Sequence, residues 1–127
     1  MKSTRWPPWR IWALVIGGVW VVVFGYLLFA ADPPDFFWDD IAEVDGPAHV
    51  VGGITTGVIA FVLVADRRRA LWLAFGGSVA VLVLLEVAQD VFTDRRYEAS
   101  DLGLALVGAA AGVVLAAAVG RWFQNAR

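Results

Sequence analysis

The chain has 127 residues, of which 60% are hydrophobic and only 17% are charged, and its mean hydropathy is +0.70. An ordinary globular domain has about 45–50% apolar and about 25% charged residues, and a soluble chain of this length has no interior large enough for the excess. This composition therefore excludes a soluble domain and indicates a membrane protein. The absence of cysteine excludes disulfides and thiolate chemistry, and the net charge of −2 carries no sign of a basic nucleic-acid-binding surface.

The first predicted membrane span follows a short basic segment. Residues 1–10 contain three basic side chains, Lys2, Arg5 and Arg10, and residues 11–31 contain no charge. This pattern also suggests a signal peptide, but a cleavable apolar core has about 7–15 residues, and this stretch is longer. We therefore predict an uncleaved first transmembrane helix. An outer loop over residues 32–46 follows, in which Pro33 and Pro34 prevent the helix from continuing.

Three further apolar stretches have lengths near the value of about 20 residues that a helix needs to cross a bilayer. The second stretch has His49 as its only titratable side chain, and the third has Glu86 near its end. Because the stretches are continuous and do not alternate, they exclude a strand barrel. The predicted segments are a helix at 47–65, a cytoplasmic loop at 66–69, a helix at 70–89, an outer loop at 90–101, a helix at 102–120 and a cytoplasmic tail at 121–127.

The distribution of basic residues predicts the side of the membrane that each segment faces. Eight of the ten basic residues lie before the first helix, between the second and third helices, or after the fourth helix. Short basic segments stay in the cytoplasm, so the two acidic loops are expected to face outward. The sequence thus predicts an all-α membrane protein with four transmembrane helices in a compact bundle and both termini cytoplasmic.

Two pairs of glycines indicate close packing between helices. Gly53 and Gly57 are four residues apart in the second helix, and Gly108 and Gly112 are four apart in the fourth. Small residues at this spacing allow two helix backbones to approach closely. We interpret both pairs as packing within the bundle. Association between two chains through the same glycines is the alternative.

Polar side chains gather at the predicted outer ends of the helices. Asp45 and His49 are four residues apart and share a helical face, and Glu86 and Gln89 share another. His49 and Glu86 lie inside apolar helices, where an ionisable residue is costly and marks a functional site by default. A structural hydrogen-bonded clamp is the alternative for this pair. Several other carboxylates are typical of solvated loop charges: Asp32, Asp35, Asp39, Asp40 and Asp94.

The residue types in this cluster indicate the chemistry open to it. A histidine with a carboxylate one turn away, as in His49 with Asp45, can act as a general base or nucleophile, and Glu86 can act as the acid. Arg95 or Arg96 could bind a phosphate or carboxylate through two hydrogen bonds. A histidine among carboxylates could instead hold a divalent cation, although the sequence requires no cofactor or metal. The expected ligand is a phospholipid or polyprenyl-phosphate headgroup at the outer face.

The polar residues follow one another in an ordered set: Asp45-x3-His49, then Glu86-x2-Gln89, then Arg95-x5-Asp101, followed by Gly108. This set resembles the VanZ-like family of small multi-span bacterial membrane proteins, named after a teicoplanin-resistance accessory protein. The resemblance covers about residues 45–112. Two positions depart from the family pattern: Ala105 replaces an asparagine, which removes a polar contact from the expected site, and Val50 replaces a frequent aromatic residue.

The resemblance implies a multi-pass protein of the bacterial inner (plasma) membrane that is linked to glycopeptide tolerance and acts on, or binds, phosphate-bearing lipid headgroups. The implied catalytic residues are His49, Asp45 and Glu86. The implied substrate-binding residues are Arg95, Gln89, Asp101 and Glu98.

If the protein is an enzyme, it is a headgroup hydrolase or transferase; a non-catalytic binding or scaffold protein is the alternative. A small transporter is disfavoured, because no charged residue lies at mid-membrane depth. Lipids are the expected partners, nucleic acid is not, and the oligomeric state is left open.

Overall fold

The computed structural model describes residues 8–29, 45–65, 68–92 and 99–125. No strand occurs in these ranges, so the predicted all-α class is confirmed. The described residues form four helices, α1 (Pro8–Phe29), α2 (Asp45–Val64), α3 (Ala70–Phe92) and α4 (Ala99–Asn125).

The helices extend beyond the apolar stretches that predicted them. α3 continues to Phe92 and α4 begins at Ala99, so Asp90 and Asp101 are helical, although the sequence placed both in an outer loop. A prediction from hydropathy places the end of a membrane span where charged residues begin, but charged residues do not end a helix. A carboxylate is stable in a first helical turn because the unpaired N–H groups there point toward it. Asp101 occupies that place in α4.

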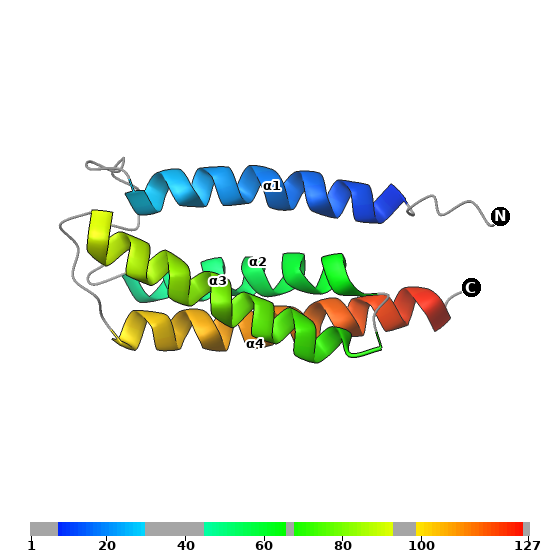
Figure 1. The fold of residues 1–127 in the computed structure, drawn as a ribbon. Coiled ribbons are helices and arrows are strands. Elements are labelled where there is room, and N and C mark those ends of the chain that lie inside the picture. The colour runs from blue at the N-terminus through cyan, green and yellow to red at the C-terminus, as the bar shows by residue number, and fades with distance from the viewer. Residues whose placement is uncertain (1–7, 30–44, 66–67, 93–98, 126–127) are drawn as a thin grey trace.

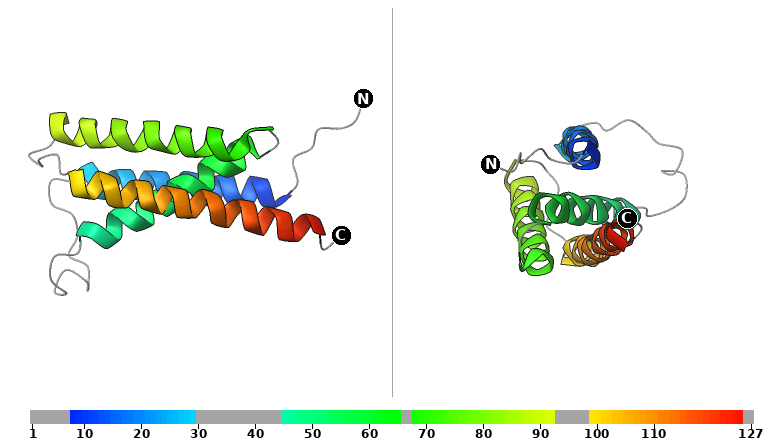
Figure 2. Two further views of the ribbon diagram at one scale, coloured as in Figure 1. Left: turned by 90° about the horizontal axis from the view of Figure 1, so that it is seen from below. Right: turned by 90° about the vertical axis from the view of Figure 1, so that its right-hand side faces the viewer.

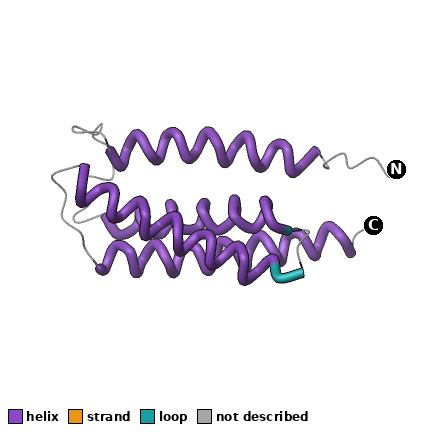
Figure 3. The backbone as a smooth tube through the Cα atoms, viewed as in Figure 1, coloured by secondary structure: helices purple, strands orange, loops and turns teal. Residues whose placement is uncertain are grey.

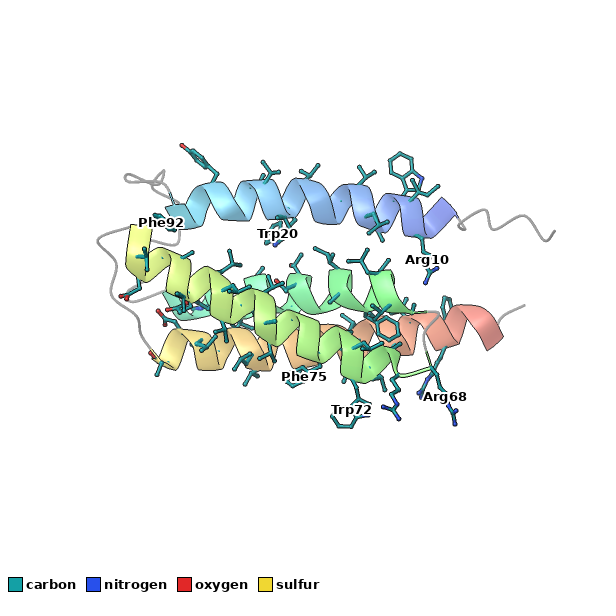
Figure 4. All side chains as sticks on the ribbon, viewed as in Figure 1. Arg10, Trp20, Arg68, Trp72, Phe75 and Phe92 are labelled. Atoms are coloured by element: carbon teal, nitrogen blue, oxygen red, sulfur yellow. The ribbon has the colours of Figure 1, made fainter. Side chains whose placement is uncertain are left out.

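Helices α2, α3 and α4 form a bundle, and α1 lies beside it. The largest interface joins α2 to α4, and α3 packs against both. α1 lies along one side, where it contacts α2 and touches α3 (Figures 1 and 2). Arg10 and Trp20 point from α1 toward the other helices (Figure 4). Arg10 is buried, although the sequence placed it in the segment before the first helix.

The helices alternate in direction along the chain, so the start of α1 and the end of α4 lie at the same end of the bundle (Figures 1 and 3). The opposite end gathers the end of α3 and the starts of α2 and α4, and we call it the polar end because it carries His49, Glu86, Gln89 and Asp101. This arrangement makes α2 and α4 parallel to each other. Both helices therefore bring their first turns to the polar end.

A line of backbone contacts joins α2 to α4, and we call it the glycine seam. A Cβ atom added at any of its four glycines would overlap a backbone carbonyl oxygen of the facing helix. The predicted packing of the glycine pairs within the bundle is thus confirmed, and both pairs belong to one interface. The glycine and the facing carbonyl are Gly53 with Ala105, Gly57 with Ala109, Gly108 with Val50, and Gly112 with Ile54.

The outside of the structure is apolar along most of its length. Large side chains such as Ile16, Leu84 and Val107 are each about two-thirds exposed. Three helical segments are long and apolar enough to cross a membrane, and in α1 the described apolar stretch is shorter, Arg10–Val23. An exposed apolar surface of this extent suits lipid and not water. The three membrane-length segments are Gly46–Val64, Ala70–Phe92 and Ala99–Trp122.

Hydroxyl side chains inside the helices are satisfied by their own backbone. The Ser78 hydroxyl, which is fully buried, donates to the Ala74 carbonyl at 2.8 Å. Thr55 and Thr56 likewise donate to carbonyls four residues earlier. Such bonds satisfy the hydroxyl in a setting without water, so these residues need no ligand.

Candidate functional site

A small cavity lies at the polar end, between α2, α3 and α4. It offers about 20 Å³ to the centres of water-sized molecules. One water needs about 10–15 Å³ on this measure, so the cavity holds a single water or a group of similar size. The residues that line it are His49, Gly52 and Gly53 from α2, Leu82, Leu85, Glu86 and Gln89 from α3, and Leu102 and Ala105 from α4.

His49 lies close to a carboxylate of another helix. Its Nε2 atom is 3.9 Å from Oδ2 of Asp101, and the two side chains are 13% and 20% exposed. The sequence paired His49 with Asp45, four residues earlier on the same helix. Asp45 begins α2, but its side chain lies outside the described part of the chain. The distance between His49 and Asp101 is longer than a hydrogen bond, so Asp101, predicted as a substrate-binding residue, is positioned to stabilise the imidazolium ion by its charge.

The glycine seam explains why His49 and Asp101 meet. Along the seam, Gly53 of α2 faces Ala105 of α4. His49 precedes Gly53 by four residues, and Asp101 precedes Ala105 by four. Residues four apart lie one above the other on a helix, and the two helices are parallel. Moving four residues toward the start of each helix from the pair Gly53 and Ala105 therefore brings His49 opposite Asp101.

Glu86 and Gln89 belong to the buried face of α3. They continue a line of buried residues that begins with Ala74, Ser78 and Leu82. Only 9% of Glu86 and 7% of Gln89 is exposed, and both side chains line the cavity. The structure thus brings together four of the seven residues predicted for the site: His49, Glu86, Gln89 and Asp101.

The remaining predicted site residues cannot be placed against this cavity. Arg95 and Glu98 lie outside the described residues, as does Arg96, so the predicted phosphate contact stays a prediction. Within the described ranges, no group of three or more His, Asp or Glu side chains could hold a metal ion. The divalent cation left open by the sequence is thus not assigned to any of these residues.

The sequence predicted a packing role for Gly53 and did not predict that Gly52 and Gly53 line the cavity. They lie three and four residues after His49, on the same helical face. Ala105 lines the cavity as well, at the position where the VanZ-like pattern has asparagine. The spacing of the two glycines from His49 could have indicated that they lie beside the site. Small residues in a membrane helix also predict close helix packing, so the spacing alone did not decide between the two.

Comparison with known proteins adds nothing to this picture, since no family model, no curated protein and no solved structure matches the chain. The resemblance to the VanZ-like family accordingly rests on the quoted residues alone. The chemistry open to the cavity follows from the residues at the cavity itself. It combines a histidine next to a carboxylate with a second, buried carboxylate, in a space of molecular dimensions at one end of an apolar bundle.

Proposed function

We propose that this chain is a VanZ-like protein of the bacterial inner membrane that binds phosphate-bearing lipid headgroups at the outer face, hydrolyses or transfers them, and contributes to glycopeptide tolerance. In this proposal all four helices span the membrane and both termini are cytoplasmic. The observation that carries it is the position of His49, which lines the cavity and lies 3.9 Å from Asp101. Ionisable side chains enclosed between apolar helices are costly to keep there and commonly serve function.

The proposed chemistry is hydrolysis of a headgroup phosphate ester. His49 accepts a proton from a water molecule, and the water oxygen forms a bond to phosphorus while the bond to the leaving oxygen breaks. His49 then returns the proton to the leaving oxygen. Asp101 stabilises the imidazolium ion between these two steps. Because histidine serves as both base and acid, the acid role predicted for Glu86 is not needed.

A direct test uses the purified full chain in vesicles that contain phosphatidylethanolamine, phosphatidylglycerol and a polyprenyl phosphate. We expect water-soluble headgroup or inorganic phosphate to be released over time. If lipid stays bound to the protein without any release, the protein is the non-catalytic binding module that the sequence left as the alternative. If lipid is neither bound nor cleaved, the headgroup proposal is wrong.

The proposed orientation can be tested by cysteine labelling, because the natural chain contains no cysteine. We expect a membrane-impermeant maleimide to label Ser100→Cys in cells whose inner membrane is intact. Arg68→Cys, in the segment between α2 and α3, should be labelled only after the membrane is opened. Both positions are exposed in the structure, so a difference in labelling reports the side of the membrane and not burial. The reverse pattern would show that the polar end faces the cytoplasm.

A further inference from the structure

Glu86 is the least satisfied polar side chain of the cavity. It is 91% buried and lines the space, yet no hydrogen bond or ion pair joins it to another residue of the described part. A carboxylate removed from water is costly unless a positive charge or hydrogen-bond donors compensate for it. The hydroxyls of Thr55, Thr56 and Ser78 all find partners within their own helices, so Glu86 is an exception.

The size and lining of the cavity indicate which compensating group would fit. An –NH₃⁺ group is about as large as water and carries three donors, and the cavity has room for one group of that size. Glu86 offers carboxylate oxygens, and Gln89 is a further polar residue of the same lining. A quaternary ammonium is too large for this space, and such groups are recognised by aromatic cages. Among the residues that the structure describes, no Phe, Tyr or Trp lines the cavity.

We propose that the cavity binds the primary ammonium group of a lipid headgroup, with Glu86 as its counter-charge. This inference rests on the proposed function, because it assigns the substrate class of the same site. A lipid source is favoured over a free amine by the apolar part of the lining. Leu82, Leu85 and Leu102 border the cavity in helices whose outer faces are apolar. The proposal gives Glu86 a binding role in place of the acid role predicted from sequence.

The test is a series of headgroups with increasing N-methylation. Short-chain phosphatidylethanolamine, its monomethyl and dimethyl derivatives and phosphatidylcholine would be titrated against the purified full chain in detergent. We expect the dissociation constant to rise by about ten- to a hundredfold from the primary to the quaternary amine, since a charged hydrogen bond is lost. Equal affinity for phosphatidylethanolamine and phosphatidylcholine would overturn the proposal. This comparison needs only the wild-type protein, so it does not depend on how a variant folds.

Two variants test whether Glu86 is the residue that distinguishes the primary amine from the quaternary amine. Glu86→Gln keeps the shape of the side chain and removes its charge, so it should reduce the preference for the primary amine to less than about threefold. Asp90→Asn is the matched control: it removes a carboxylate four residues further along α3, on an exposed position. The control should keep the wild-type preference. If Asp90→Asn loses the preference, or if Glu86→Gln keeps it, the general acidity of the polar end and not the cavity is responsible.

Two further measurements answer two separate questions: whether the amine comes from a lipid or from a free amine, and whether the amine proposal fails independently of the proposed function. Free ethanolamine at millimolar concentration should not displace the lipid, and displacement would show that the amine alone is the ligand. Headgroup release is measured independently of binding. Release of all headgroups at equal rates would contradict the amine proposal but leave the enzyme proposal standing. Selective binding of phosphatidylethanolamine without release would support the amine proposal and contradict the enzyme proposal.

Discussion

Replacing Gly53 or Gly108 with alanine is expected to lower the free energy of unfolding by about 1–3 kcal/mol each, and by more if the backbones cannot move apart. A Cβ atom at Gly53 would overlap the Ala105 carbonyl, and one at Gly108 would overlap the Val50 carbonyl. The obstacle in both cases is backbone, which cannot rotate away as a side chain can. The helices must therefore separate, and the close contacts along the rest of the seam are lost. Unfolding of the purified protein by titration with a denaturing detergent measures the change.

Two other glycines provide matched controls for this experiment. Gly103 lies in α4, like Gly108, but a Cβ there would meet nothing within 4 Å. At Gly17 the three atoms nearest to an added Cβ all belong to the side chain of Ile59, the nearest at 2.7 Å, and a side chain can shift. Alanine is the better helix former by about 0.8–1.0 kcal/mol in soluble hosts, so Gly103→Ala should be neutral or slightly stabilising. Equal destabilisation by Gly103→Ala and Gly108→Ala would show that the seam is not the cause.

The second large effect is expected on headgroup release. His49→Ala should reduce the rate by about 10²–10⁴-fold, the usual contribution of a positioned general base. Asp101→Asn should reduce it less, because asparagine keeps the size of the side chain and loses only the charge that stabilises the imidazolium ion. The rate is measured in the vesicle assay at equal amounts of inserted protein. An unchanged rate in His49→Ala would rule out the proposed catalytic mechanism.

The control for this prediction is again Asp90→Asn, which lies at the polar end but does not line the cavity. It should leave the rate within about a factor of two of wild type. Circular dichroism and detergent unfolding of each variant show whether the bundle is intact. In cells, His49→Ala should also abolish any contribution of the protein to glycopeptide tolerance. A tolerance effect that persists without headgroup release would favour the binding alternative.

The positions of the helices could be predicted from sequence because burial in lipid demands a long apolar run. The ends of the helices could not, because carboxylates such as Asp101 are compatible with a first helical turn. The position of α1 beside the bundle was also not predictable. Its apolar side chains, among them Ile16 and Val22, are as compatible with lipid as with protein, and hydropathy does not distinguish the two environments.

The site was predicted in part, and the contact that was not predicted has a simple explanation. Spacing along one helix identified His49 and, separately, Glu86 with Gln89, since residues three or four apart share a face. It could not reveal that Asp101 lies 3.9 Å from His49, because that distance depends on how α2 and α4 are aligned. The alignment is set by backbone contacts at glycines, such as Gly53 against Ala105. Those contacts become apparent only when both helices are placed together.

The parallel alignment of α2 and α4 has a consequence for how such a chain can diverge. Because the seam sets the relative height of the two helices, the segments that connect them can change in length without moving His49 away from Asp101. The constrained quantities are two intervals of four residues, from His49 to Gly53 and from Asp101 to Ala105. An insertion within either interval would turn the polar side chain about 100° around its helix. Homologues are therefore expected to vary in their loops and to preserve these two intervals.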